Sequence, residues 1–349
     1  MARRSAALAV VGAVISAALL GCAERTTAAK TPEPPPEPVV VSYVDSITAS
    51  TVRARIAALS DDSMRGRFTP GAELNKAAAW AVSEFQRFGL GPGPATGFLQ
   101  TVDYAGVGSA PNVIGVLEGR DSVLKSEYVV VLAHLDHLGV AGQGWCSLAG
   151  ADSICNGADD NASGSAAVLE LARAFAASSP RPRRSMLFLL VSGEERGEWG
   201  SQYYVAHPAV PIAQTVAAIN LDMVGRSLGD GVMGIGRERS SLGPLADSVA
   251  ASHPELHMRV IPDTMPQENL FARSDQYSFA RVGVPALCFF TGLHADYHRP
   301  SDTVEKIEAE REARIVRLVY YLALQVANGA ARPAVRQATA PARGPVAPP

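Results

Sequence analysis

The sequence predicts an α/β domain with a mixed, largely parallel central sheet and helices on both of its faces. Short runs of residues that are apolar throughout alternate with helical patterns along the chain. Strands of that kind are typical of a sheet that is covered on both sides. Because no segment repeats at a fixed period, we expect one large domain over residues 45–330.

The first predicted element is a helix over residues 72–88, where large residues recur at helical spacing and Gly89 follows as a typical C-terminal cap. Apolar runs of β type come next, and helical patterns such as residues 164–178 lie between the middle ones. The runs cover residues 112–117, 128–133, 185–191, 215–221 and 284–290. A long helix over residues 303–328 carries one apolar stripe and is expected to close the domain.

Both ends of the chain are predicted to lie outside this domain. Residues 1–21 place two arginines before an apolar run that is too short to span a bilayer comfortably, which is the layout of a secretory signal. Residues 22–44 are proline-rich and typical of an extended spacer. Residues 331–349 are rich in alanine and proline and are expected to form a disordered tail.

The tetrapeptide "LLGC" that ends at Cys22 resembles the bacterial lipobox. That resemblance implies that the signal is removed before Cys22 and that Cys22 carries a lipid. Ala23 is not the aspartate that favours retention at the inner membrane, so the resemblance implies an exported protein anchored in the outer membrane, facing the periplasm, or at the cell surface. An ordinary cleaved signal with an incidental cysteine is the alternative.

Charge and cysteine content exclude some classes of function. The net charge of −3, with both signs spread along the chain, offers no basic stripe and argues against a nucleic-acid partner. Cys146 and Cys155 could close a short disulfide loop, which fits an oxidising compartment, and their spacing is not typical of zinc ligands. Cys288 lies in an apolar run and is expected to be a buried free thiol.

Ionisable residues follow the ends of four predicted strands. Ligands collect beyond the carboxyl ends of the strands in open α/β sheets, because the loops converge there. In chain order these residues are His134, Asp136, His137, Glu194, Glu195, Asp222, His294, Asp296 and His298. A solvated charge or a satisfied histidine could explain any one of these strand ends, but their concurrence predicts a functional site.

Histidine and carboxylate ligands without cysteine suit Zn²⁺, and also Mn²⁺ or Co²⁺. Two histidines with three carboxylates are too many for one tetrahedral catalytic ion, but they fit two ions that share a bridging carboxylate. Two such ions, about 3.5–4 Å apart, would hold a hydroxide between them and polarise a carbonyl group.

The neighbours of these ligands also have predicted roles. Of the adjacent Glu194 and Glu195, one would bind metal and the other would act as general base and then as general acid toward the leaving amine. Asp136 is expected to face the same way as His134 and to accept a hydrogen bond from its second ring N–H. His137 would face away from that pair and is assigned to the loop.

Five motifs occur in order along the chain: "AHLDH", "NGADDNASG", "SGEERGEWGS", "NLDMVG" and "DYHRPSDT". Together they resemble the co-catalytic dizinc aminopeptidases related to bacterial leucyl aminopeptidase, a family that also contains glutaminyl cyclases and glutamate carboxypeptidase. The resemblance covers nearly the whole body and implies the three-layer fold of zinc aminopeptidases, which is phosphorylase/hydrolase-like. It implies two zinc ions per chain, held through His134, Asp160, Glu195, Asp222 and His298.

In this resemblance His134 and Asp222 hold one zinc ion, Glu195 and His298 hold the other, and Glu194 is the base. The residues alone leave either Asp159 or Asp160 as the bridging ligand. The family places the bridging aspartate three residues before the serine of "SG", which selects Asp160, and the peptide bond after it is often cis. Tyr297 corresponds to a tyrosine that hydrogen-bonds the developing oxyanion in some relatives. Gln276 departs from the family, where a histidine is often found.

The resemblance implies a metallo-aminopeptidase that acts on peptides with a free N-terminus. Larger relatives carry a protease-associated insertion ahead of the catalytic motifs. Because this chain lacks room for it, we expect a simpler and more open substrate cleft. A glutaminyl-cyclase-like acyltransferase would use one zinc ion and would not be expected to keep the His134 ligand. A dizinc carboxypeptidase remains an alternative, although the motifs contain no dense arginine cluster. The third alternative, a catalytically inert lipid-anchored binding protein, conflicts with the survival of all five ligands and Glu194.

Overall fold

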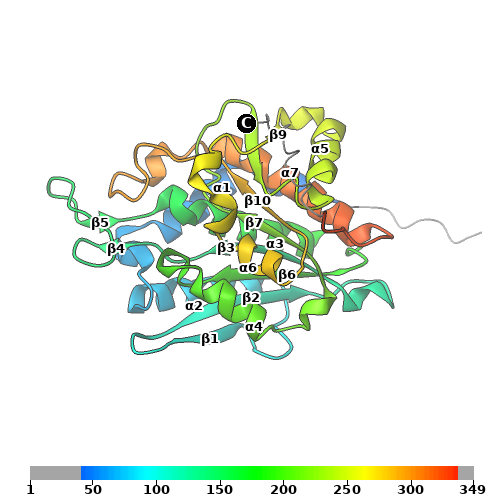
Figure 1. The fold of residues 1–349 in the computed structure, drawn as a ribbon, viewed down its shortest axis with the longest axis horizontal. Helices are drawn as coiled ribbons and strands as arrows, with labels where there is room; N and C mark the ends of the chain where they lie inside the picture. The colour runs from blue at the N-terminus through cyan, green and yellow to red at the C-terminus, as the bar shows by residue number, and fades with distance from the viewer. Residues whose placement is uncertain (1–40, 337–349) are drawn as a thin grey trace, which may run out of the picture. The chain divides into compact units, whose positions relative to one another are not determined.

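The computed structural model describes residues 41–336, and these residues form a mixed eight-stranded sheet in the order β1-β2-β6-β3-β7-β10-β8-β9 (Figure 1). The strands are β1 (Leu99–Tyr104), β2 (Gly108–Leu117), β3 (Tyr128–His134), β6 (Ser185–Val191), β7 (Thr215–Leu221), β8 (Gly231–Ile235), β9 (Arg259–Ile261) and β10 (Ala286–Phe290). The central strands β6, β3, β7 and β10 are parallel, while β2 and β8 run antiparallel to their central neighbours and the edge strand β1 runs antiparallel to β2. The predicted mixed, largely parallel sheet is confirmed.

Helices cover both faces of the sheet. The bounds are α1 (Ala49–Leu59), α2 (Ala72–Arg87), α3 (Gly164–Ala177), α4 (Trp199–Ala206), α5 (Leu242–Ser252), α6 (Gln276–Arg281) and α7 (Ala309–Asn328). Helices α1, α2, α3 and α7 pack together on one face, and α4 and α6 contact each other on the opposite face. Figure 1 shows α4 and α6 in front of the sheet in that view.

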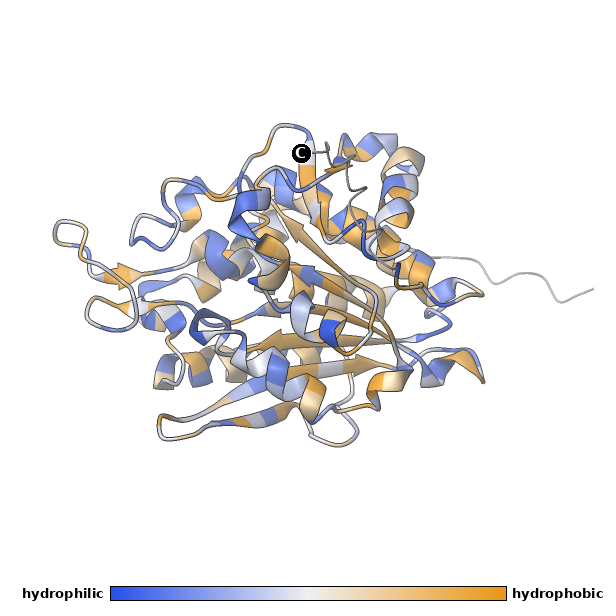
Figure 2. Cartoon of the chain, viewed as in Figure 1, coloured by the Kyte–Doolittle hydropathy of each residue, from blue (hydrophilic) through white to orange (hydrophobic). Residues whose placement is uncertain are grey.

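The apolar strands supply side chains to both of these layers. Along β3, Val129 and Val131 belong to the core beneath α3, whereas Val130 and Leu132 belong to the core beneath α4 and α6. Successive side chains of a strand point to opposite faces, so a strand covered on both sides has to be apolar at every position. Figure 2 shows the resulting hydrophobic colour along the central strands.

The structure divides the predicted closing helix into two parts. Residues Val304–Lys306 form a short 3-10 turn, and α7 begins only at Ala309. Ile307 adopts an extended conformation and is buried, and the N–H of Glu308 donates to the carbonyl oxygen of Gly225 at 2.9 Å. These contacts with the body override the helical pattern of the sequence at this point.

The domain extends slightly beyond both predicted boundaries. Val41, from the predicted spacer, exchanges two main-chain hydrogen bonds with Ser179, and Val335, from the predicted tail, pairs with Ser240. The predicted signal, Cys22 and the rest of the predicted spacer and tail lie outside the described residues. None of the helices within residues 41–336 combines the length and the apolar character that a membrane crossing needs.

The guanidinium group of Arg67 connects segments that surround the carboxyl end of β3. It is fully buried and donates to the carbonyl oxygens of Leu59, Leu135, Asn156 and Gly157 at 2.6–3.0 Å. Burial lowers the pKa of Arg67 to about 10, with the charge of Asp136 and other carboxylates opposing that change, so the group stays protonated at neutral pH.

We expect the substitution Arg67→Met to lower the free energy of unfolding by about 3 kcal/mol or more, because it leaves several buried carbonyl oxygens without a donor. Urea denaturation followed by circular dichroism measures this change. Arg65→Met is the matched control, because the side chain of Arg65 is 55% exposed and its replacement should cost less than about 0.5 kcal/mol. Equal midpoints for the two variants would contradict a structural role for Arg67.

Candidate metal centre

The ionisable residues that follow the strands gather at one edge of the sheet. Strands β3, β6, β7 and β10 run parallel, so their carboxyl ends meet at this edge. The cluster contains His134 at the end of β3, Asp160 from the segment before α3, Glu194 and Glu195 in a 3-10 turn after β6, Asp222 after β7, and His298 in the loop after β10. These segments are far apart in the sequence and are brought together only by the fold.

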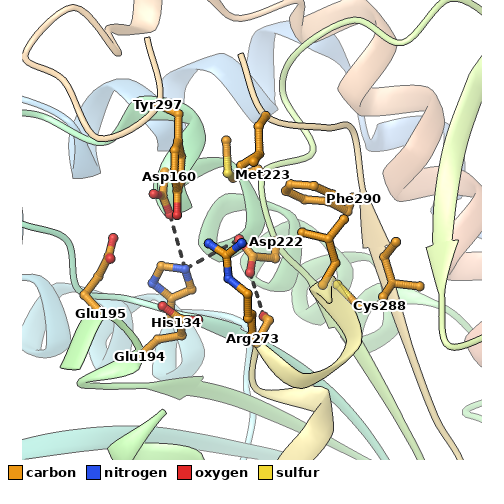
Figure 3. A pocket seen from close by; sticks show the side chains of 14 residues that line it. His134, Asp160, Glu194, Glu195, Asp222, Met223, Arg273, Cys288, Phe290 and Tyr297 are labelled. Carbon is orange, nitrogen blue, oxygen red and sulfur yellow. Dashed lines mark hydrogen bonds and ion pairs between the residues drawn. The ribbon is translucent and has the colours of Figure 1, made fainter. Parts of the chain in front are cut away.

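Asp160 lies at the middle of the cluster. Nε2 of His134 is 3.4 Å from Oδ1 of Asp160 and 3.5 Å from Oδ1 of Asp222 (Figure 3). Nε2 of His298 is 3.2 Å from Oδ2 of Asp160 and 3.2 Å from Oε2 of Glu195. The two oxygens of Asp160 therefore face two different histidines, which is the arrangement expected of a carboxylate shared by two cations.

The neighbouring Asp159 points away from this cluster. Its Oδ1 accepts a hydrogen bond from the N–H of Gly225 at 2.7 Å, and its Oδ2 lies 3.1 Å from Nε2 of His294. Of the two aspartates that the sequence left open, only Asp160 faces the cluster. The peptide bond between Asp160 and Asn161 is cis, as the resemblance implies.

Asp302 and Asn161 hold the segment that carries Asp160. The carboxylate of Asp302 is buried and accepts hydrogen bonds from the N–H of Asp159 at 2.9 Å and from the N–H of Asp160 at 3.1 Å. Nδ2 of Asn161 donates to the carbonyl oxygen of Leu221, at the end of β7, at 3.0 Å. Sequence reasoning assigned no role to Asp302, and its position within "DYHRPSDT" was the only signal that could have pointed to it.

His137 does not face away from the cluster, so its assignment to the loop alone was wrong. The side chain is fully buried, and its Nδ1 lies 2.9 Å from Oε1 of Glu195. The regular strand ends at His134, and His137 instead makes a bridge to Phe68 while its N–H donates to the carbonyl oxygen of Arg67. The alternation rule fails here because it applies only while the chain stays in a regular strand.

Asp136 also differs from its predicted role. Nδ1 of His134 lies 3.2 Å from the main-chain oxygen of Asp136 but 3.7 Å from its carboxylate, so the carbonyl group is the hydrogen-bond partner of the imidazole. The carboxylate of Asp136 instead accepts a hydrogen bond from the N–H of Glu194 at 3.3 Å. Asp136 therefore connects His134 with the turn that carries the two glutamates.

The donor set fits divalent metal ions of the zinc type. Ligand atoms of His134, Asp160 and Glu195 lie within 4.8 Å of one another, and so do those of His134, Glu194 and Asp222. Within residues 41–336, Oδ2 of Asp160 and Nε2 of His137 are buried without a hydrogen-bond partner. Imidazole and carboxylate groups converging in this way are ligands that zinc prefers. In the set formed by His134, Glu194 and Asp222, Glu194 lies as close to the other two residues as a metal ligand would.

Desolvation and neighbouring charges separate the pKa values of the two adjacent glutamates. Desolvation, joined by the carboxylates of Glu195 and Asp222, raises the pKa of Glu194 well above its ordinary value. Desolvation also disfavours the charged form of Glu195, but hydrogen bonds from His137 and His298 outweigh it and lower the pKa of Glu195. The cluster thus contains a glutamate that holds a proton readily beside one that stays charged.

A pocket of about 440 Å³ opens beside the cluster. Apolar side chains also line it, namely Met223, Ile235, Leu270, Phe290 and Leu293, together with the polar side chains of Arg273 and Ser274. In the view of Figure 3, Met223 and Phe290 lie on one side of Asp222, and Glu194 and Glu195 lie on the other.

Tyr297 also lines this pocket, and its ring stacks on the imidazole of His298 with 3.7 Å between the ring centroids. Cys288, which lines the pocket, is a buried free thiol, as the sequence predicted. Cys146 and Cys155 are joined in a disulfide, the pairing that the sequence left open.

Gln276 belongs to a hydrogen-bond network behind Asp222. Nδ2 of Asn220 donates to Oε1 of Gln276 at 2.9 Å and to Oγ of Ser274 at 2.8 Å. The hydroxyl of Ser274 in turn donates to Oδ2 of Asp222 at 2.6 Å. Gln276 and Ser274 therefore belong to one buried hydrogen-bond network that ends on the carboxylate of Asp222. Sequence reasoning assigned no role to Ser274.

The family model described as Peptidase family M28 matches residues 112–323, which is well over half of the chain. A probable zinc metalloprotease of Leptosphaeria maculans is 27% identical over 208 residues, covering 56% of this chain and 46% of that protein. Aminopeptidase YwaD of Bacillus subtilis is 25% identical over 214 residues, covering 58% of this chain and 42% of that protein. The matched part of this chain spans less than half the length of these curated relatives.

Solved structures of two enzymes share the fold. The aminopeptidase LapA of Legionella pneumophila superimposes with a TM-score of 0.64 at 19% sequence identity, covering 82% of this chain and 73% of that one. Glutaminyl cyclase of Porphyromonas gingivalis gives a TM-score of 0.63 at 20% identity, covering 80% of this chain and 99% of that one. The fold is therefore that of the zinc aminopeptidases, and it is shared with a glutaminyl cyclase.

Proposed function

This chain belongs to peptidase family M28, and from that membership we propose that it is a zinc-dependent aminopeptidase that removes N-terminal residues from peptides. One observation carries the proposal: the carboxylate of Asp160 faces His134 with one oxygen and His298 with the other, beside a pocket that is lined in part by apolar side chains. The similarity to aminopeptidase YwaD of Bacillus subtilis supports the same activity.

Two zinc ions would be held by the cluster, His134 and Asp222 around one, Glu195 and His298 around the other, with Asp160 shared. The proposal rests on the donor types and on their convergence within ligand distance of one another. When bound there, zinc supplies a Lewis acid for the scissile carbonyl group and lowers the pKa of a water molecule. Mn²⁺ or Co²⁺ would suit the same donors.

Glu194 has the position of the acid–base group. Its side chain lines the pocket, and its N–H is anchored on the carboxylate of Asp136 at 3.3 Å, which fixes the turn next to the ligand Glu195. In the proposed reaction Glu194 removes a proton from the attacking water and then donates it to the leaving nitrogen. Water adds to the carbonyl carbon, the C–N bond breaks, and a carboxylate and an amine are released.

The pocket supports recognition of a free N-terminus. Its carboxylates, including Glu194 and Asp222, attract an α-ammonium group, and its apolar side chains, among them Met223 and Phe290, accommodate the side chain of the first residue. Tyr297, held by its stacking on His298, is proposed to donate its hydroxyl hydrogen to the oxyanion that develops on the carbonyl oxygen.

The test compares three short peptides with purified, zinc-loaded enzyme: one with free N-terminal leucine, its N-acetylated form, and one with N-terminal glutamine. We expect release of leucine from the free peptide only, because the acetyl group removes the positive charge that the carboxylates of the pocket attract. Product analysis by mass spectrometry follows all three. Equal cleavage of the acetylated peptide would refute exopeptidase action, and loss of ammonia from the glutamine peptide in place of hydrolysis would favour a cyclase.

We also propose that the protein is exported and anchored to a membrane through Cys22. The charged start of residues 1–21, the "LLGC" sequence and the spacer that follows support this localisation. The disulfide between Cys146 and Cys155 supports an oxidising compartment. Cells that express the wild type or Cys22→Ala are fractionated and compared. The wild type should be found with the membranes, and Cys22→Ala should be found in the soluble fraction. A variant that stays with the membranes would exclude this anchor.

A further inference from the structure

A second pocket adjoins the metal cluster on the side of Glu195. Its volume, including space open to solvent, is about 980 Å³, against about 440 Å³ for the first pocket, and Glu195 lines both. Asp136 and His137 form its inner wall, and Phe68, Trp145 and Arg196 form its outer part. A peptide whose first residue fills the smaller pocket has to continue past Glu195, so this larger space is where the part after the scissile bond would lie.

Arg196 is the only lysine or arginine among the residues that line this second pocket. Its guanidinium group lies over two aromatic rings, 5.3 Å from the centroid of Phe68 and 5.2 Å from that of Trp199. Within residues 41–336 it has no carboxylate at ion-pair distance, although twelve other arginines do. Cation–π contacts therefore hold a charged group at the pocket while its N–H donors stay free for an anion.

The other charges of the pocket do not compete for Arg196. Both carboxylate oxygens of Glu195 face histidines, Oε1 toward His137 at 2.9 Å and Oε2 toward His298 at 3.2 Å. The carboxylate of Asp136 is fully buried and accepts a hydrogen bond from the N–H of Glu194. A carboxylate that enters from solvent would therefore meet Arg196 as the free charged partner.

Trp145 forms the rim of this pocket. Its side chain is 73% exposed, and its ring centroid lies 6.4 Å from that of His298. The hairpin of β4 (Gly139–Val140) and β5 (Ile154–Cys155) and the disulfide of the adjacent Cys146 fix the loop that carries it. A tryptophan held in solvent next to a proposed ligand offers a flat apolar surface to a bound chain.

Building on the proposed aminopeptidase function, we propose that this pocket binds the leaving part of the substrate and that Arg196 pairs with a carboxylate one residue beyond the scissile bond. Two sources present that group: the free C-terminus of a dipeptide and an aspartate or glutamate side chain at the second position. The preferred substrates are then dipeptides and peptides with an acidic second residue. Arg196 is the residue that determines this specificity.

The experiment measures kcat/KM for Leu-Ala, Leu-Ala-amide, Leu-Glu-amide and Leu-Gln-amide with the full-length, zinc-loaded protein. We expect Leu-Ala to exceed its amide, or Leu-Glu-amide to exceed Leu-Gln-amide, by about 10- to 100-fold, the range of a charged hydrogen bond. The first comparison reports a C-terminal carboxylate and the second reports a side-chain carboxylate. Preference in either pair supports the proposal, and ratios near 1 in both pairs overturn it.

In Arg196→Gln, the kcat/KM ratio of the substrate pair that the wild type discriminates should fall close to 1. Arg196→Lys should retain part of that preference, because lysine keeps the charge but lacks the planar guanidinium group with its paired N–H donors. Each ratio is measured within one variant, so partial loss of folded protein does not affect it. The control Arg120→Gln, at an exposed position outside the lining of this pocket, should keep the wild-type ratio. An unchanged ratio in Arg196→Gln overturns the proposal while leaving the aminopeptidase function intact, whereas failure of the wild type to cleave any of the four substrates refutes both.

Discussion

Replacing Glu194 by glutamine is expected to lower kcat by about 10²- to 10⁴-fold, the range that a positioned general base supplies. The amide keeps the shape of the side chain in the pocket but cannot take a proton from water. The main-chain hydrogen bond from Glu194 to Asp136 is unaffected by this substitution, so the turn that carries Glu195 should persist. Steady-state kinetics with a free N-terminal leucine peptide, together with zinc analysis of the same sample, measures the effect.

Zinc content is what separates a catalytic from a ligand role here, because Glu194 lies as close to His134 and Asp222 as a ligand would. If Glu194 is the base, Glu194→Gln keeps its zinc and loses turnover. If zinc and activity are lost together, Glu194 is a ligand and the assignment is wrong. Glu238→Gln, at a side chain that is 69% exposed, is the matched control and should retain both.

Asp160→Asn is expected to remove most of the bound zinc and to lower activity by more than about 100-fold. Substitution of a residue that only orients a metal ligand lowers metal affinity or activity by about 10- to 100-fold. Substitution of a carboxylate shared by two ions should therefore lower them further. The neutral amide removes the negative charge that faces both His134 and His298. Mass spectrometry of metal content after dialysis, in parallel with peptide hydrolysis, gives the result.

Asp103→Asn serves as the control for this variant, because Asp103 is exposed on β1 and distant in the sheet order from the end of β3. It should bind as much zinc as the wild type. The proposed bridging role fails if Asp160→Asn binds two zinc ions per chain with the wild-type affinity. Circular dichroism of both proteins excludes loss of fold as the cause of a low metal content.

Several strands that are buried on both faces could be predicted from the sequence, although the short β8, which is also buried at every position, was not predicted. The runs at residues 185–191 and 215–221 coincide with β6 and β7, because a central parallel strand is apolar at every position. Strand β1 was not predicted, since alternate residues of Leu99–Tyr104 are exposed at the edge of the sheet. Its polar positions resemble a loop until pairing with β2 is known.

The cluster was predictable where ionisable residues directly follow strands or stand in recognised motifs. His134 and Asp222 are examples, since both lie at strand ends that the sequence delimits well. His137 was missed because its direction depends on how the chain leaves β3 and on its bridge to Phe68, from a segment far away in the sequence. Contacts between distant segments, such as the hydrogen bonds from the N–H groups of Asp159 and Asp160 to Asp302, have no local signature.

The distribution of the cluster along the chain has a consequence for biosynthesis. The two histidines that face Asp160 are contributed by positions 134 and 298, so they are translated at widely separated times. A product truncated before residue 298 would retain the β6, β3, β7 and β10 segments and yet lack one of the two imidazoles. The complete set of proposed zinc ligands therefore exists only in translation products that extend past residue 298.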